Sequence, residues 1–268
     1  MPEDLHVAAE QCLRCAEVDR KLELARRLWD DWRAGRLSAG GGAAPPLDQA
    51  GRPPRPELVS PGRLAQRRIG TPEGQAALIH AVAHIEFNAI NLACDAVFRF
   101  RDMPDAYYAD WVRVAAEEAY HFSLLHTRLG QLGYAYGDFP AHNGLWDLAV
   151  RTAHYPLLRM ALVPRVMEAR GLDVTPGMME RFASIGDQQT VAILQIILRD
   201  EVGHVEAGSR WFRYLCEQRG LEPEATYFDL LQEHLAGGIR CPLHKPARRA
   251  AGFTESELGR LEALCKRS

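Results

Sequence analysis

The sequence contains no run that approaches the roughly 18–20 consecutive apolar residues a membrane-spanning helix needs. Its N-terminus carries acidic residues, whereas a secretory signal peptide begins with basic residues and continues with an apolar stretch. Six cysteines in 268 residues are too few for a disulfide scaffold, and we expect them to be free thiols in a reducing compartment. These absences predict a cytoplasmic protein that does not enter a membrane.

Neither sign of charge dominates, because 32 Lys and Arg residues face 35 Asp and Glu residues for a net charge of −3. This near balance argues against a broad basic surface for nucleic acid or for membranes. Aromatic residues make up only 8% of the chain, and no segment alternates apolar and polar residues in the period of a β-strand. The composition therefore predicts an all-α fold.

Glycine, proline and capping signals divide the chain into four segments. We expect an N-terminal helical segment at 1–37 and a Pro/Gly-rich extended segment at 38–70 that packs on the rest. The third segment, 71–220, is predicted to be a four-helix bundle, followed by a C-terminal helical extension at 221–268. The expected helices lie at about 71–100, 104–132, 145–170 (ended by Gly171), 175–186, 188–219, 224–236 and 254–266.

Each long helix of the predicted bundle carries one glutamate on its apolar face: Glu86, Glu118, Glu168 and Glu201. Burying a carboxylate is costly unless it is paired, so four of them require a shared counter-charge. Two of the glutamates are followed three residues later by a histidine, His121 or His204. Residues at i and i+3 project from the same side of a helix, so each Glu-x-x-His pair can face one point.

The spacing repeats, with 32 residues from Glu86 to Glu118 and 33 from Glu168 to Glu201. Four carboxylates and two imidazoles are the ligand set of a dinuclear metal site in a four-helix bundle. These ligands suit iron, with manganese or a mixed pair as alternatives. Glu117 and Asp200 precede the two motifs, and we expect each to accept the second N–H of a metal-bound histidine. The alternative is that these acids form surface salt bridges.

Several pieces of the chain resemble the ferritin-like proteins of domain-of-unknown-function family 455. They include His84-Ile85-Glu86, Glu117 to Phe122, Glu168 to Asp173, and Asp200 to Val205, together with residues 51–61 and 247–253. The resemblance covers nearly the whole chain and implies a ferritin-like bundle with a dinuclear metal site, but no settled reaction. The segment from Cys241 to His244 departs from the family, where an apolar, aromatic-containing segment is expected.

Other candidate sites have simpler explanations. Cys12 and Cys15 could join Cys241 and His244 in a zinc site, although two unrelated thiols are the simpler interpretation. His84 follows His80 by one turn but points away from Glu86, so we expect a surface or inter-helix hydrogen bond there. Tyr120 lies beside the ligands, as a redox-active phenol or, by default, as a packing residue.

Three functions fit these observations. The first is an oxidoreductase that activates O2 or peroxide at two iron ions, acts on a small-molecule substrate and takes electrons from an external donor. The second is iron storage or detoxification, and the third is a bundle with a structural metal site. Hydroxylation of a tRNA base is an analogy only, and a homodimer is left open.

Gly203 and Gly208 either leave room for O2 beside the metals or allow close helix packing.

Overall fold

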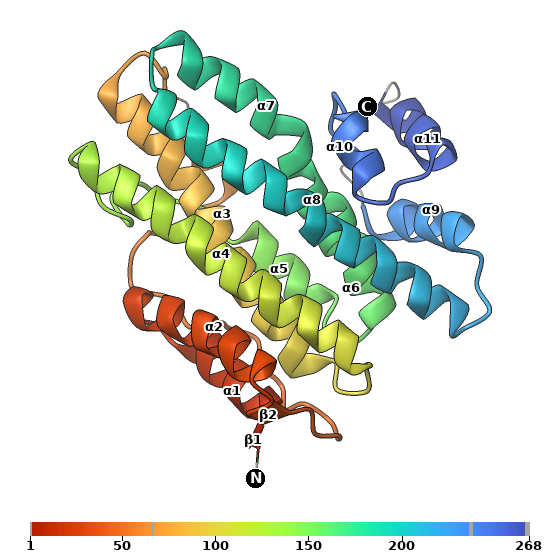
Figure 1. Ribbon diagram of the computed structural model, residues 1–268. Coiled ribbons are helices and arrows are strands. Elements are labelled where there is room, and N and C mark those ends of the chain that lie inside the picture. Colours follow the sequence, from red (N-terminus) through yellow and green to blue (C-terminus); the bar gives the residue numbers. More distant parts are fainter. Residues whose placement is uncertain (1, 66, 236–237, 266–268) are drawn as a thin grey trace. The chain divides into compact units, whose positions relative to one another are not determined.

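The computed structural model describes residues 2–65, 67–235 and 238–265, most of which are helical (Figure 1). The all-α class predicted from the sequence is therefore confirmed. The chain forms two compact units, Met1–Val150 and Arg151–Ser268, and each is described by itself. The boundary between them falls inside the segment 71–220, which the sequence analysis treats as one bundle.

The first unit is built on two long helices, α3 (Pro72–Arg99) and α4 (Asp105–Gln131), which pack along each other. α1 (Leu5–Arg14) packs on α3, and α2 (Val18–Arg33) packs on α4. The parallel strands β1 (Glu3–Asp4) and β2 (Leu37–Ser38) flank these two helices in the sequence, and α5 (Gly144–Arg151) follows α4. The predicted start of α3 is confirmed, since the Thr71 hydroxyl accepts a hydrogen bond from Gly74 N at 3.1 Å and Pro72 is the first helical residue.

α3 is the core helix of this unit. One 18-residue window of α3 has a mean hydropathy of 1.3, enough to cross a membrane by length and composition alone. The expectation that the sequence has no uninterrupted apolar run of this length still holds, because Glu86 and Asn88 interrupt the run, although they leave its average hydropathy high. However, 78% of that window is buried inside the protein, as it is in the core helix of many soluble proteins.

The segment from 39 to 71 is mostly irregular, with one turn of 3₁₀-helix, η1 (Pro61–Arg63). It lies against the helices of the first unit. The Leu47 carbonyl accepts a hydrogen bond from the Arg99 guanidinium at 2.9 Å, and the Asp48 carbonyl accepts one from Trp146 Nε1 at 2.9 Å. Glycine is required at position 51, because a Cβ there would overlap the backbone of Arg14.

The second unit begins with a continuous helical run of α6 (Pro156–Leu162), the π-helical segment η2 (Val163–Glu168) and α7 (Ala169–Ser184). α8 (Gln188–Glu217) packs against all three of these elements (Figure 1). The prediction that Gly171 ends a helix is wrong, because the helix continues through Pro176 to Ser184. Burial of Leu172, Thr175 and Phe182 on α7 outweighs the local cost of the glycine and the proline.

Three further helices complete the second unit: α9 (Pro223–His234), α10 (Lys245–Ala250) and α11 (Glu255–Cys265). The sequence analysis did not predict α10. The predicted capping box is present, since Thr254 N donates to the Glu257 carboxylate at 2.9 Å and Glu257 N donates to the Thr254 hydroxyl at 3.0 Å. The predicted helix ends at residues 236 and 266 lie outside the described residues.

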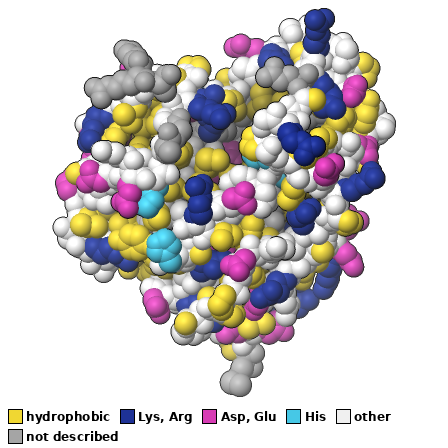
Figure 2. All heavy atoms as spheres, turned by 180° about the vertical axis from the view of Figure 1, so that it is seen from behind, with side chains coloured by type: hydrophobic (Ala, Val, Ile, Leu, Met, Phe, Trp, Pro, Cys, Tyr) yellow, Lys and Arg dark blue, Asp and Glu magenta, His cyan; other side chains and the backbone are white. Residues whose placement is uncertain are grey.

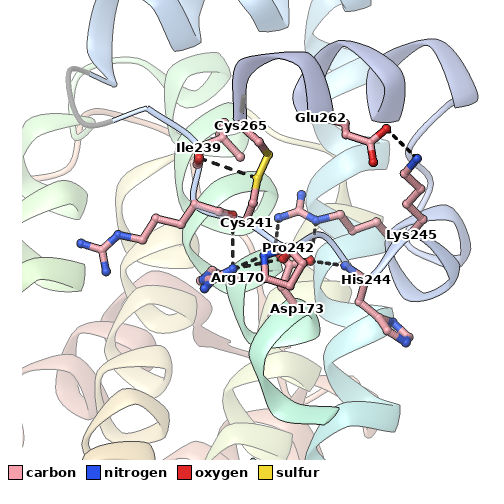
Figure 3. The surroundings of a disulfide bond; sticks show 11 residues. Arg170, Asp173, Ile239, Cys241, Pro242, His244, Lys245, Glu262 and Cys265 are labelled. Atoms are coloured by element: carbon pink, nitrogen blue, oxygen red, sulfur yellow. Dashed lines mark hydrogen bonds and ion pairs between the residues drawn. A yellow bond between two sulfur atoms is a disulfide. The ribbon is translucent and has the colours of Figure 1, made fainter. Parts of the chain in front are cut away.

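Cys241 and Cys265 form a disulfide between the segment that precedes α10 and the end of α11 (Figure 3). Their Cα atoms are 5.8 Å apart, within the usual range for a disulfide. The prediction of free thiols is therefore wrong for this pair, whose 24-residue separation gives no sequence signal. Since Cys241 is bonded to Cys265, it is not a thiolate ligand for zinc with Cys12 and Cys15.

The described surface is mixed in charge. On the face shown in Figure 2, the basic and acidic side chains of the described residues are interspersed with polar and apolar ones. This distribution agrees with the small net charge of −3.

Candidate metal centre

Three of the predicted ligands meet inside the first unit. Glu86 comes from α3, while Glu118 and His121 come from α4, and their exposed fractions are 3%, 0% and 0%. His121 Nδ1 is 3.2 Å from the Glu86 carboxylate and 3.3 Å from the Glu118 carboxylate. The ligand atoms of these three residues lie within 4.8 Å of one another. This buried group of Glu and His residues could hold a metal ion.

Local sequence explains how the three side chains come together. Glu86 lies on the face of α3 that also carries Ala83 and Ile90, both fully buried. Glu118 and His121 are one turn apart on α4, so both point toward α3 where the two helices pack. Because the side chains around them are largely apolar and buried, the charged forms of the carboxylates are costly unless they are paired.

The electrostatics of the cluster favour a cation. Burial, and then the nearby Glu118 carboxylate, raise the pKa of Glu86 well above its ordinary value, while His121 acts in the opposite direction. A single Nδ1 cannot donate its one proton fully to two carboxylates. A metal ion between the two carboxylates would supply the missing positive charge, and carboxylate with imidazole is a donor set that iron and manganese accept. The residues therefore fit a metal.

The second unit carries the matching motif. Glu201 and His204 lie one turn apart on α8, with exposed fractions of 8% and 0%, and His204 Nδ1 is 3.6 Å from the Glu201 carboxylate. Glu168 is the last residue of η2, which packs on α8, and it is half-buried. Each unit thus presents its own Glu-x-x-His pair with the imidazole Nδ1 toward the glutamate. Binding of all six residues to one centre stays a prediction.

The two acids that precede the motifs have arginine partners on their own helices. Glu117 faces Arg113 at 3.4 Å, and Asp200 faces Arg199 at 2.8 Å. Their roles as acceptors for the metal-binding histidines stay predictions. Tyr120 is 48% exposed, so the default expectation of a packed tyrosine is not met. Its ring centroid is 6.4 Å from that of His121.

His80 and His84 are structural rather than metal-binding in this unit. The His84 ring accepts a hydrogen bond from the Tyr136 hydroxyl at 2.9 Å and donates one to the His142 carbonyl at 3.1 Å. His80 Nε2 accepts a hydrogen bond from Gly137 N at 2.9 Å. Burial lowers the pKa of each histidine to about 4. The expected hydrogen-bonding role is confirmed, but both rings are buried and hold the loop after α4.

The sequence gives no sign that four cationic side chains of the described residues, Lys21, Arg159, Arg165 and Arg248, are buried. Lys21 is fully buried, and its ammonium donates to the carbonyls of Cys12 at 2.8 Å and Leu13 at 3.1 Å and to the Asn91 side chain at 2.5 Å. Arg165, which the sequence places beside Glu168, is 1% exposed. Neither Lys21 nor Arg165 carries a local signal of burial, because the partners that compensate its charge are remote in the sequence or are backbone atoms.

Comparison with known proteins supports the resemblance to domain-of-unknown-function family 455. A Haemophilus influenzae protein described as an uncharacterized protein is 44% identical over 260 residues, covering 93% of this chain and 90% of that protein. No solved structure matches significantly. The family model described as "Protein of unknown function (DUF455)" matches residues 14–259, and the chain belongs to this family.

Proposed function

We propose that this protein binds two metal ions, iron in preference to manganese, and activates O2 or peroxide for the oxidation of a small molecule. The proposed ligands are Glu86, Glu118, His121, Glu168, Glu201 and His204. The observation that carries the proposal is the buried contact of one histidine with two carboxylates, His121 with Glu86 and Glu118. It is supported by the matching Glu-x-x-His pair of the second unit and by the repeated spacing of 32 and 33 residues.

The residues of the chain have separate tasks in this proposal. The glutamates supply negative charge and the histidines supply neutral nitrogen ligands, while the apolar faces of the helices exclude water. Glu117 and Asp200 accept a hydrogen bond from the one N–H that each metal-bound histidine keeps, and so fix the ring orientation. Two reduced iron ions, when bound, supply the electrons for reduction of O2 or peroxide. An external electron donor must then reduce the iron ions again.

Metal analysis of protein purified without added metal tests the proposal first. We expect two ions per chain in the wild type and loss of at least one in Glu118→Gln and in Glu201→Gln. Glu206→Gln is the matched control, because Glu206 lies on α8 but forms an ion pair with Arg210 at 3.0 Å. Retention of two ions in both ligand variants would contradict the ligand assignment.

The oxidation step needs its own measurement. The reduced iron form should react with O2 or peroxide faster than the metal-free protein, and the optical spectrum should change as the iron is oxidised. If two metals are bound but no accelerated oxidation is seen, a structural metal site replaces the oxidoreductase. Storage would instead give more than two iron ions per chain. A cytoplasmic location and a homodimer stay predictions.

A further inference from the structure

The segment that carries Glu168 has an unusual backbone. η2 is a π-helical turn over Val163–Glu168 that interrupts the α-helical run from α6 to α7. π-turns are less stable than α-turns and occur mostly as short insertions, frequently at functional sites. Pro164 lies inside η2 and packs so closely on α8 that a Cβ on Gly208 would overlap its ring. Such a turn persists only where surrounding contacts hold it.

One of those contacts is a buried arginine in the middle of η2. The Arg165 guanidinium lies over three aromatic rings, 4.0 Å from the centroid of Tyr227, 4.7 Å from Phe253 and 4.9 Å from Phe212. Its Nη2 donates to the Glu257 carboxylate on α11 at 2.5 Å. The Tyr227 hydroxyl donates to the Arg165 carbonyl at 3.1 Å, so both the side chain and the backbone of Arg165 are held by the C-terminal extension.

A second buried ion pair lies on the other side of Glu168. Asp173 on α7 accepts hydrogen bonds from the Arg248 guanidinium on α10 at 2.7 and 2.9 Å. It also accepts one from His244 N at 2.8 Å, as Figure 3 shows. Arg170 reaches the same stretch, at the carbonyl of Pro242. Glu168 is three residues after Arg165 and five residues before Asp173. The C-terminal extension therefore forms ion pairs with the chain on both sides of Glu168.

We propose that the C-terminal extension, through the pairs Arg165–Glu257 and Asp173–Arg248, holds η2 in its π-helical form and thereby orients Glu168 for metal binding. Arg165 is then a positioning residue. If η2 relaxed to an α-helix, its turn would contain about one residue fewer. The Glu168 side chain would then point in a direction about 100° away from its present one, relative to α6. The inference rests on the proposed function, since it takes Glu168 as a metal ligand.

The chemistry of the pair favours positioning over stability. Desolvating a buried arginine and glutamate offsets much of their attraction, and an apolar pair of similar volume is often as stable. What a charged pair adds is direction, as in the Asp173–Arg248 pair, where the guanidinium fork donates two hydrogen bonds and fixes the angle of approach.

Three variants separate the two roles. Arg165→Met keeps side-chain length but leaves Glu257 buried without its cation. Glu257→Gln removes the charge yet keeps the capping box, because glutamine serves at this position as well. The double variant carries neither charge, so its thermal stability should return close to that of the wild type. The matched control is Arg99→Met/Asp95→Asn, which removes a buried pair of 2.7 Å from α3 in the first unit.

Two measurements apply to each variant. The first is the affinity for Mn²⁺ or Co²⁺ by competitive titration, with the absorption spectrum of bound Co²⁺ as a report on ligand geometry. We expect the double variant to bind the weaker ion about 10–100-fold less tightly with an altered spectrum, while the control binds as the wild type does. The second is amide hydrogen exchange over residues 163–168 in metal-free protein, which should be faster in the double variant.

The outcomes are distinguishable. Wild-type affinity, spectrum and exchange in the double variant would overturn the inference. If affinity instead returns together with stability, Arg165 has a structural role only and the inference also fails. If the wild type binds no metal, the proposed function fails. Hydrogen exchange then still decides whether the Arg165–Glu257 pair holds η2.

Discussion

Gly208 on α8 lies directly against Pro164 in η2, and a Cβ at position 208 would overlap the Pro164 ring. The glycine is therefore explained by close helix packing, and the expectation that it leaves room for O2 is wrong. Gly203 differs, because no atom of the described residues outside its own stretch of helix lies within 4 Å of a Cβ built there. Because the surroundings of Gly203 are open, its proposed role in giving O2 access to the metals stays a prediction.

Substitution of these two glycines should have opposite effects. Gly208→Ala should lower the free energy of unfolding by about 1–3 kcal/mol, because Pro164 has to move. Gly203→Ala should raise it by about 0.5–1 kcal/mol, the usual gain from alanine in a helix interior. Urea denaturation of the metal-free proteins measures both. Equal effects of the two substitutions would contradict the packing account of Gly208.

His80 should make the stability of the first unit depend on pH. Burial lowers the pKa of His80 to about 4 in the folded state, opposed by Asp138, while the unfolded histidine takes up its proton near 6.5. Between these values the unfolded state binds more protons, so stability is full above about pH 6.5 and falls as the pH drops toward 4. Protonation also removes the acceptor that holds Gly137 N.

The slope of the free energy of unfolding against pH measures how many more protons the unfolded state binds. His80→Gln should therefore reduce that slope across this window by the contribution of up to about one proton. Glutamine can still accept a hydrogen bond from Gly137 N. His234→Gln serves as the control, since the side chain of His234 is 33% exposed. An unchanged slope in His80→Gln would show that other groups carry the pH dependence.

Asp200 and Glu117 should matter for metal retention rather than for folding. Asp200→Asn should weaken metal binding by about 10–100-fold, the usual cost of losing an acceptor behind a metal-bound histidine. The melting temperature of the metal-free protein should change little. Glu117→Gln is expected to act in the same way. Arg199→Gln tests whether the ion pair with Asp200 at 2.8 Å contributes instead, and loss of metal in that variant alone would reverse the assignment.

Lys21 should be required for the stability of the first unit. Lys21→Met removes one donor from each of two carbonyls at the end of α1, which still accept from Cys15 N and Gly51 N, and takes the ammonium donor from the buried Asn91 oxygen, at about 1–3 kcal/mol. Lys245→Met is the matched control, because the side chain of Lys245 is 40% exposed and its ion pair with Glu262 should contribute less than about 1 kcal/mol. Comparable losses in both variants would contradict the capping role.

The parts of the fold that local signals define could be predicted from the sequence. Thr71 and Pro72 start α3 and the Thr254–Glu257 capping box precedes α11, because these residues satisfy backbone donors within one turn. The π-turn of η2 and the continuation of α7 through Pro176 could not be predicted. They depend on packing between elements, such as Pro164 on Gly208, and local propensity gives the opposite answer.

The same distinction between local sequence signals and packing of remote elements applies to the candidate site. Glu86, Glu118 and His121 could be predicted because acids on apolar helix faces are costly and stand out. Arg165 and its partner Glu257 are 92 residues apart, and nothing near either residue marks the pair. The Cys241–Cys265 bond is likewise decided by how α10 and α11 fold back, which the residue types alone do not specify.

Lysine is scarce in this chain, which contains only Lys21, Lys245 and Lys266. Because the Lys21 amine is enclosed and makes three hydrogen bonds, acylating reagents cannot reach it while α1, α2 and α3 stay packed. Any label that appears at Lys21 must therefore come from molecules whose first unit has opened. A single buried amine thus makes the opening of this unit measurable by peptide mass spectrometry, without any introduced probe.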